Sequence, residues 1–175
     1  MRYKIVASFD NNSTDYLKSI NYTLRKKLRL NRYNNNYHIE IISTSNMDLN
    51  VLNKVLSDIL TPYKKFMVRI DDNICINANN RKINLKVLNK GYLSKITRNI
   101  SDTLRLYGFK LNKCYDECDF YMTIFDFNRR NSHYINRLNN SFNLVKNTLK
   151  INKIEVLGIN DKKELLVKSF PLREY

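Results

Sequence analysis

The stretches Tyr37-His38-Ile39-Glu40-Ile41 and Phe120-Tyr121-Met122-Thr123-Ile124 decide the fold of this chain. Each is short, rich in strand-forming residues, and alternates polar with apolar side chains. Because alternate side chains of a strand share a face, each stretch offers a polar pair on one face and an apolar pair on the other. The two stretches lie about 80 residues apart, in matching places of two similarly ordered halves, so we expect their polar faces to form a shared cleft.

The polar residues of this predicted cleft are titratable or hydrogen-bonding types. They are His38, Glu40, Tyr121 and Thr123. His38 is one of only two histidines in the chain, and imidazole is the side chain that titrates nearest neutral pH. Plainer interpretations stay open: Glu40 as an exposed strand residue, and Tyr121 as an interior aromatic residue with its hydroxyl satisfied.

The composition fits a protein with a core of its own. At 175 residues and 43% apolar content, the chain is long enough to bury a sizeable core. No segment reads as a signal peptide or approaches the roughly 20 apolar residues that span a bilayer. We therefore expect a cytoplasmic protein with no membrane partner, and a monomer is favoured.

The formal net charge of +15 indicates a polyanionic partner. A plainer explanation competes, since the abundance of Asn, Ile, Lys and Tyr is typical of an AT-rich genome, in which lysine accumulates without selection for a ligand. Arginine is less subject to that drift, and the chain still carries a substantial set of arginines. RNA or a small phosphorylated nucleotide is therefore the predicted partner.

Cysteine and glycine usage points away from metal and cofactor sites. Cys75, Cys114 and Cys118 lack zinc-site spacing, and neither histidine lies near them in the sequence. The three glycines lie far apart, which excludes a glycine-rich phosphate loop or a dinucleotide fingerprint. We expect reduced thiols, no metal and no cofactor.

The apolar pattern predicts the order strand, helix, strand, helix, strand twice along the chain. The first half contains a predicted strand at 2–9, a helix capped by Ser13 or Thr14, the His38 strand, a helix capped by Asp48, and a strand at 65–76. The second half contains a predicted strand at 81–88, a helix ended by Gly108, the Tyr121 strand, a helix carrying Tyr134, Leu138, Phe142, Val145 and Leu149, and strands at 151–159 and 164–170.

This order predicts an α+β fold that is bilobal and pseudo-duplicated, with antiparallel sheets and flanking helices. No linker rich in Pro, Gly or Ser divides the chain. We therefore expect a single domain over 1–175, with lobe halves at roughly 1–78 and 79–175.

The motifs and their spacing resemble those of the two-histidine (2H) phosphoesterase superfamily, which includes the 2′-5′ RNA ligase-like proteins and the cyclic phosphodiesterases. That family carries the pattern His-apolar-Thr/Ser-apolar once in each half of a bilobal fold. The first motif here is His38-Ile39-Glu40-Ile41, with glutamate in place of Thr/Ser. The second is Tyr121-Met122-Thr123-Ile124, with tyrosine in place of the second histidine. The likeness covers nearly the whole chain, from Arg2 to Arg173.

The resemblance implies a metal-independent phosphodiesterase in which one imidazole removes a proton from the attacking oxygen and the other protonates the departing oxygen. On this chain it implies His38 and Tyr121 as the catalytic residues. It places Glu40 and Thr123 in the substrate-binding positions. Lys82 and Lys86, on the strand that opens the second half, are further candidates for contacting a phosphate if they face the cleft.

Both departures from the family pattern weaken that mechanism. Tyrosine is a poorer proton donor than histidine near neutrality, because the pKa of an unperturbed phenol is about 10. A Glu40 carboxylate about 4 Å from a phosphate is repelled by on the order of 4 kcal/mol at an effective dielectric near 20, unless it is protonated, turned away or paired with a lysine or arginine. His133 could move toward the cleft and supply a replacement acid.

Three functions therefore stay open. The first is a descendant of a 2′,3′-cyclic or 2′-5′ phosphodiesterase with partly degraded motifs. The second is a non-catalytic RNA-binding or nucleotide-binding protein that keeps the cleft and the basic surface. The third is a protein-interaction module with a vestigial cleft.

Overall fold

The computed structural model describes residues 2–28, 36–45, 48–77, 81–88, 90–114, 119–126, 147–160 and 163–174. The helices in this part of the chain are α1 (Asn11–Leu28), α2 (Leu49–Leu60) and α3 (Gly91–Leu106). The strands are β1 (Arg2–Phe9), β2 (His38–Ser45), β3 (Phe66–Asn77), β4 (Lys82–Val87), β5 (Leu111–Cys114), β6 (Tyr121–Asp126), β7 (Thr148–Asn160) and β8 (Lys163–Pro171). All pairings between these strands are antiparallel, which confirms the predicted α+β class.

The strands form one sheet in the order β1-β2-β6-β4-β3-β7-β8, with β5 beside β2 and a further pairing between β1 and β7. The β1–β7 pairing divides the sheet into two parts, which we call wings. One wing consists of β8, β7, β1, β2 and β5. In the other wing, β6 pairs with the beginning of β2, β3 pairs with the beginning of β7, and β4 lies between β6 and β3. Each wing contains strands from both sides of residue 78. The two wings therefore do not coincide with the halves 1–78 and 79–175, because strands of both halves pair with one another. The single domain over 1–175 with these lobe halves stays a prediction.

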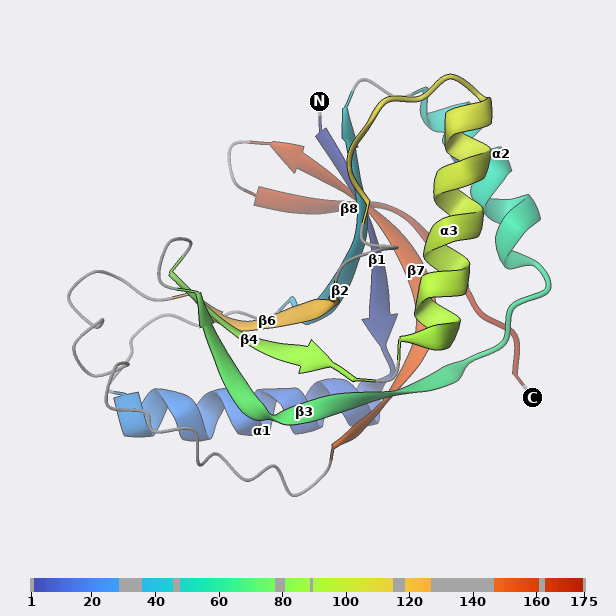
Figure 1. Ribbon diagram of the computed structural model, residues 1–175. Coiled ribbons are helices and arrows are strands. Elements are labelled where there is room, and N and C mark those ends of the chain that lie inside the picture. The colour runs from blue at the N-terminus through green and yellow to red at the C-terminus, as the bar shows by residue number, and fades with distance from the viewer. Residues whose placement is uncertain are drawn as a thin grey trace.

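The helices cover different wings of the sheet (Figure 1). α1 lies against the wing that contains β6, where the buried amide of Asn21 donates to the carbonyl of Ile124 over 2.8 Å. α2 and α3 lie side by side and contact strands of the other wing, β8, β2 and β5. Within the described residues, no helix is both long and apolar enough to cross a membrane.

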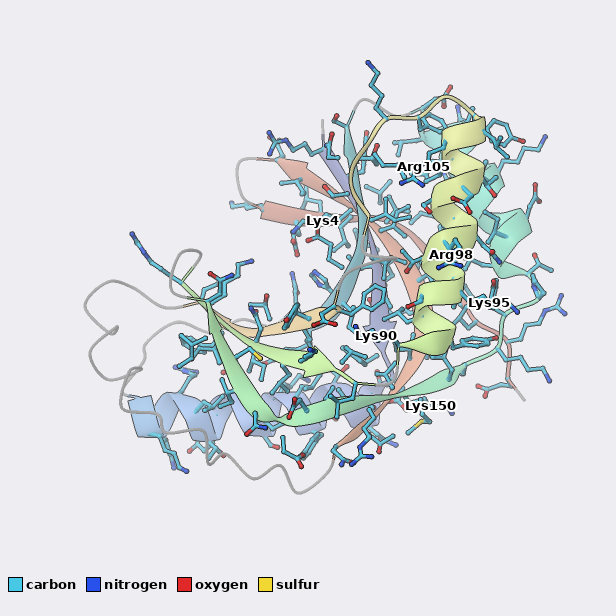
Figure 2. All side chains as sticks on the ribbon, viewed as in Figure 1. Lys4, Lys90, Lys95, Arg98, Arg105 and Lys150 are labelled. Atoms are coloured by element: carbon cyan, nitrogen blue, oxygen red, sulfur yellow. The ribbon has the colours of Figure 1, made fainter. Side chains whose placement is uncertain are left out.

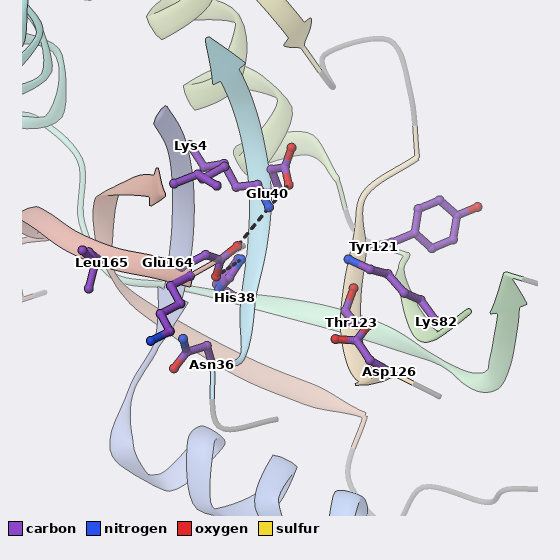
Figure 3. A pocket seen from close by; sticks show the side chains of 12 residues that line it. Lys4, Asn36, His38, Glu40, Lys82, Tyr121, Thr123, Asp126, Glu164 and Leu165 are labelled. Atoms are coloured by element: carbon purple, nitrogen blue, oxygen red, sulfur yellow. Dashed lines mark hydrogen bonds and ion pairs between the residues drawn. The ribbon is translucent and has the colours of Figure 1, made fainter. Parts of the chain in front are cut away.

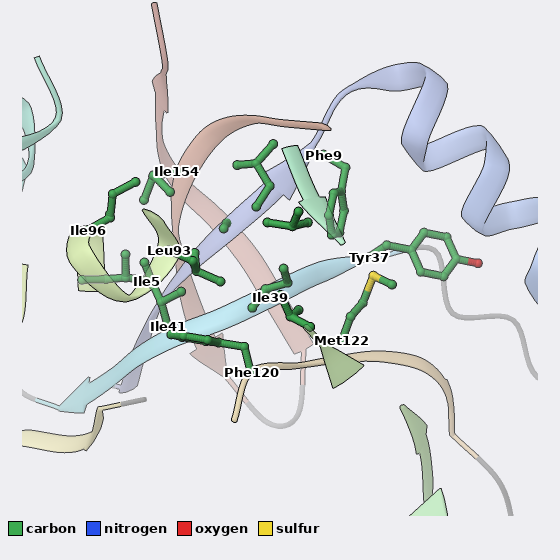
Figure 4. Close-up of a cluster of buried hydrophobic side chains, with 14 of the residues drawn as sticks. Ile5, Phe9, Tyr37, Ile39, Ile41, Leu93, Ile96, Phe120, Met122 and Ile154 are labelled. Atoms are coloured by element: carbon green, nitrogen blue, oxygen red, sulfur yellow. The ribbon is translucent and has the colours of Figure 1, made fainter. Parts of the chain in front are cut away.

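The apolar halves of the two decisive stretches lie in the core, as predicted. Ile39, Ile41, Met122 and Ile124 have no exposed surface. Figure 4 shows three of them, Ile39, Ile41 and Met122, beside Leu93 of α3 and among side chains from β1 and β7. Fully burying such a side chain contributes about 1.5–3 kcal/mol to the stability of the fold. These four apolar residues, the floor of the site, therefore fix which face of β2 and β6 is left for the polar residues.

Two helix starts test the predicted caps. The carboxylate of Asp48 accepts from the backbone N–H of Asn50 at 2.8 Å, which confirms its capping role. The first helix begins at Asn11, earlier than predicted, because the carboxylate of Asp10 accepts from the Ser13 N–H at 2.8 Å. The hydroxyl of Ser13 is used elsewhere and accepts from the N–H of Lys150 at 2.9 Å.

The predicted helix carrying Tyr134, Leu138, Phe142, Val145 and Leu149 mostly lies outside the described residues, as does His133. Its last position is a correction, because Leu149 belongs to β7 and lies opposite Val68 of β3. Leu149 and Ile151 are both fully buried, so the apolar residues there follow the two-residue period of a strand. The strand β5 was missed, and Gly108 ends the third helix with the positive φ of 79° that glycine tolerates.

Candidate functional site

The two decisive stretches are neighbours in the sheet. Ile39 of β2 lies opposite Met122 of β6 in their antiparallel pairing. Opposite residues of an antiparallel pair point to the same face, and both of these are buried in the core. The flanking residues therefore share the other face, with position 38 beside position 123 and position 40 beside position 121. This is the juxtaposition that the sequence predicts.

The shared polar face opens into a groove of about 580 Å³. Its lining comes from β1, β2, β4 and β6, from the end of β7 and the beginning of β8, and from Asn36 just before β2. The lining residues are Lys4, Asn36, His38, Glu40, Lys82, Tyr121, Thr123, Asp126, Ile159, Lys163, Glu164 and Leu165. All four polar residues of the predicted cleft are among them.

One wall of the groove is an ion-paired network that is largely removed from water (Figure 3). The ammonium of Lys4 lies 3.0 Å from the Glu40 carboxylate and 2.9 Å from that of Glu164. These side chains are only 20%, 23% and 21% exposed, respectively. Glu40 is thus paired with a lysine. Such a pairing is one of the three ways, named above, in which the repulsion between Glu40 and a phosphate is relieved.

His38 belongs to the same wall. Its side chain is 15% exposed, and its Nε2 atom lies 3.9 Å from a carboxylate oxygen of Glu164. Burial lowers the pKa of His38, and the attraction of Glu164 offsets this only in part. His38 is therefore mainly neutral at neutral pH and can accept a hydrogen bond or a proton.

The two charged neighbours of His38 shift in opposite directions. Burial raises the pKa of the Glu164 carboxyl, but His38 and the hydrogen bond from Lys4 lower it by more. Burial lowers the pKa of Lys4, but Glu40 and Glu164 raise it by more. Both groups therefore stay ionised near neutral pH, and the network holds its charges.

The opposite wall is more open. Figure 3 shows the side chains of Thr123 and Asp126 on β6, with the ammonium of Lys82 directed back toward His38. Tyr121 stands at the edge of this wall, 40% exposed, and its ring points away from His38. The hydroxyl of Tyr121 is therefore directed away from His38, although Tyr121 still lines the groove.

The two predicted lysines of β4 have different surroundings. Lys82 lines the groove. Lys86 is not among the residues that line it and lies 2.6 Å from the carboxylate of Asp119. Its pKa is raised, chiefly by the hydrogen bond to that carboxylate. Asp119 thus holds the ammonium of Lys86, and the contact of Lys86 with a phosphate stays a prediction.

Lys4 and Glu164 are the site residues that the sequence analysis missed. Lys4 could have been predicted from the sequence, because successive side chains of a strand point to opposite faces. Ile5 of β1 is buried in the core, so Lys4 points to the face of the groove. Glu164 gives no such signal. It reaches the groove because β8 folds back on β7 and brings Glu164 opposite Ile159.

A second hollow of about 340 Å³ adjoins the groove at His38. Asn36, His38 and Glu164 line both spaces. Phe9, Leu157 and Leu166 give the second hollow apolar surface, and Lys153 and Glu155 stand at its side. Across the described residues, no group of three or more His, Cys, Asp or Glu side chains is placed to hold a metal ion.

The fold places the two motif strands, β2 and β6, side by side where the two wings of the antiparallel sheet meet, and the polar groove lies over them. This is the arrangement that the resemblance to the 2H phosphoesterases implies. Solved structures with the same fold show which proteins share it.

The crystal structure of a phosphoesterase superimposes with a TM-score of 0.66 at 10% identity, and the match covers 98% of each chain. E. coli LigT complexed with NADP⁺ matches with a TM-score of 0.67 at 9% identity, covering 98% of this chain and 97% of LigT. LigT complexed with 3′-AMP gives a TM-score of 0.65 at 9% identity, covering 98% of both chains. The predicted resemblance is thus confirmed at the level of the fold. By sequence, the chain matches no protein-family model and no curated protein.

Proposed function

We propose that the protein binds a phosphorylated nucleotide in this groove, either free or as the end of an RNA, and does not cleave it by the two-imidazole mechanism. The observation that carries the proposal is the pairing of Ile39 with Met122, which turns both motif strands toward one groove. The resemblance to the 2H phosphoesterases implies that a phosphate binds in this groove. However, position 121 supplies an outward-pointing phenol where acid–base catalysis needs a second imidazole.

The side chains of the groove suit a phosphate group. Lys82 directs an ammonium into it, Thr123 offers a hydroxyl, and neutral His38 can hydrogen-bond at the same place. The carboxylates of Glu40 and Glu164 are held by Lys4, so their repulsion of an anion is reduced. The hollow beyond His38 offers apolar surface for the nucleoside part of the ligand.

A neighbouring fold supports this ligand class. LigT has been crystallised with NADP⁺ and with 3′-AMP, both of which are phosphorylated nucleotides. With identities of 9%, that likeness supports the choice of probe more than any individual contact.

A phosphodiesterase that uses His38 as its only base is the second candidate. The lowered pKa of His38 favours it, because the neutral imidazole that a general base requires is the main form at neutral pH. The nearby Glu164 carboxylate can orient the ring and stabilise the imidazolium that proton uptake creates.

One experiment separates these candidates. The protein is titrated with 2′,3′-cyclic AMP in EDTA by calorimetry, and the mixture is then assayed for ring opening. We expect binding without turnover. Because a hydrogen bond to a charged group contributes about 1.5–3 kcal/mol, we expect Lys82→Gln to weaken binding about tenfold or more. Lys86→Gln is the matched control on the same strand and should leave the affinity unchanged, because Asp119 holds Lys86 outside the groove.

The contradicting results are equally definite. Turnover that disappears in His38→Ala would replace the proposal by the second candidate. Absence of binding, or equal losses in Lys82→Gln and Lys86→Gln, would remove the groove as a nucleotide site.

A further inference from the structure

A cavity of about 570 Å³ lies between α2 and α3, apart from the groove. Residues within 58–63 line it on one side, and residues of α3 within 92–103 line it on the other. None of its described lining residues also lines the groove or the hollow that adjoins the groove. Figure 2 shows Lys95 of this cavity beside α3, well away from Lys4 of the groove. The proposed function therefore gives this cavity no role.

The ring of Tyr92 is held in place at the beginning of α3, where it lines the cavity. Its centroid lies 5.5 Å from that of Tyr63, at an interplanar angle of 80°, and 4.7 Å from that of Phe66. Tyr63 and Phe66 are each only 6% exposed, whereas Tyr92 is 39% exposed. Two buried rings thus fix the orientation of Tyr92, and its exposed part can pack against a ring of a ligand.

The last turn of α2 places an uncompensated carboxylate at the cavity. Asp58 lies in this turn, which holds no basic residue. Among the described residues, the carboxylate of Asp58 has no ion-pair partner. The C-terminal end of a helix carries a partial negative charge, so a carboxylate there destabilises the helix unless a cation stands beside it. The end of α2 therefore favours a cationic group in the cavity.

The first turns of α3 give the cavity the opposite charge. Lys95 lies near the start of this helix, whose N-terminal end carries a partial positive charge. Within the described part of the chain, the ammonium of Lys95 has no ion-pair partner, although Asp58 lines the same cavity. Asp102, a further carboxylate of the lining, lies 3.5 Å from Arg105. The described lining thus presents one unpaired charge of each sign.

The phenol of Tyr63 fixes the amide of Asn99, which also lines the cavity. The Nδ2 atom of Asn99 donates to the hydroxyl oxygen of Tyr63 over 2.5 Å. Because the amide nitrogen is engaged with a buried phenol, the Oδ1 atom of Asn99 remains as an acceptor. This oxygen adds to the preference of the cavity for a donor such as an ammonium.

We propose that this cavity binds a free α-amino acid with an aromatic side chain. The ring of the amino acid packs against Tyr92, its ammonium is held by Asp58 and Asn99, and its carboxylate is held by Lys95. An amine alone would leave Lys95 unpaired, and a simple carboxylic acid would leave Asp58 unpaired. A zwitterion satisfies both charges and carries no net charge, so the formal charge of +15 on the protein neither attracts nor repels it.

The test compares four ligands by the chemical shifts of backbone amides in isotope-labelled protein. The ligands are L-phenylalanine, L-alanine, which lacks the ring, N-acetyl-L-phenylalanine, which lacks the ammonium, and L-phenylalaninamide, which lacks the carboxylate. L-Phenylalanine should shift the amides of α3 that border the cavity, with a dissociation constant of about 1 mM. L-Alanine should bind about tenfold more weakly, and the other two about fivefold more weakly.

Two variants assign the charges. Lys95→Gln should weaken the binding of L-phenylalanine about fivefold and leave that of L-phenylalaninamide unchanged. Asp58→Asn should likewise weaken the binding of L-phenylalanine and leave that of N-acetyl-L-phenylalanine unchanged. Lys18→Gln and Asp15→Asn are the matched controls, because they remove the same charges from α1, where these side chains are 46% and 70% exposed. Both controls should bind all four ligands as the unmodified protein does.

Several results would overturn the inference. They are no shift of the cavity amides at about 20 mM L-phenylalanine, equal affinities for the four ligands, and equal losses for L-phenylalanine and L-phenylalaninamide in Lys95→Gln. Competition by 2′,3′-cyclic AMP would do the same, because it would place the amino acid in the groove. The proposed function is tested separately, since failure of cyclic AMP to bind while L-phenylalanine still shifts the cavity amides would contradict that function alone.

Discussion

The two walls of the groove differ in how fully their polar groups are satisfied. On the wall formed by β1, β2 and β8, one lysine holds two carboxylates at 2.9 and 3.0 Å, and His38 lies against one of them. On the wall formed by β4 and β6, Lys82 and Thr123 face the open groove and Tyr121 is exposed at the rim. The first wall is built to hold its own charges, and the second is free to meet a ligand.

The difference also explains the two departures from the family motif. Where the family pattern has Thr/Ser, Glu40 lies on the wall where Lys4 offsets its charge. Where the pattern has the second histidine, Tyr121 lies on the open wall and its ring points outward. The groove is present with both residues, and the proposed function follows from the absence of a second imidazole at position 121.

The largest effect should come from restoring the motif. Glu40→Thr with Tyr121→His places an imidazole and a hydroxyl side by side on the paired strands. Because general acid–base catalysis contributes about 10²–10⁴ in rate, we expect hydrolysis of 2′,3′-cyclic AMP at least about a hundredfold above the unmodified protein. Adding His38→Ala should abolish the gain. A folded double variant that binds cyclic AMP without any gain in rate would show that position 121 does not face the reacting phosphate.

The next effect concerns the stability of the first wall. Lys4→Met leaves the carboxylates of Glu40 and Glu164 close together and only about a fifth exposed. We expect the free energy of unfolding to fall by about 2 kcal/mol in urea denaturation, because uncompensated buried charge is costly. Glu40→Gln with Glu164→Gln in that background should restore most of the loss.

The control for this prediction is Lys65→Met. Lys65 pairs with Glu174, which is 70% exposed, so the loss of stability should be much smaller than in Lys4→Met. If Lys4→Met were as mild as this control, the first wall would be no more than a solvated surface.

The smallest effect is the pH dependence that His38 gives to stability. Its pKa in the folded protein lies below the ordinary value of 6.5, chiefly because of burial. Its contribution is therefore present above pH 6.5 and is lost as the pH falls toward the lowered pKa. Between about pH 7.5 and pH 5, the free energy of unfolding should fall more for the unmodified protein than for His38→Gln.

This range stays above the ordinary pKa of 4.5 of Glu164, whose own contribution is lost only at lower pH as that group protonates. It also lies far below the range in which Lys4 loses its proton, since the pKa of Lys4 is raised above 10.5. Identical pH profiles for the two proteins would show that His38 is not buried beside charged groups as described.

The sequence could predict the floor of the site better than its walls. Alternation in the two stretches was sufficient to bury Ile39 and Met122 and to expose their polar neighbours, because a strand has a fixed period of two. The cap at Asp48 followed from equally local chemistry. The pairing of β2 with β6 required only that two apolar faces share one core.

The partners of Glu40 could not be predicted in the same way. Lys4 reaches it across a β1–β2 pairing whose register shifts between Ile5 and Val6, and no local pattern encodes that shift. Glu164 arrives through the fold-back of β8 on β7. The direction of the Tyr121 ring and the pairing of Lys86 with Asp119 likewise depend on tertiary neighbours. The order of the strands in the sheet could not be predicted for a related reason, because it depends on pairings between residues far apart in the sequence.

A crystal structure of the protein with 2′,3′-cyclic AMP tests the central claim most directly, since it shows where the phosphate sits between the two walls. We predict an intact cyclic phosphate within hydrogen-bond reach of Lys82, Thr123 and His38, with the Lys4–Glu40–Glu164 network unchanged. A phosphate bound away from this groove, or a ring-opened product within it, would contradict the account.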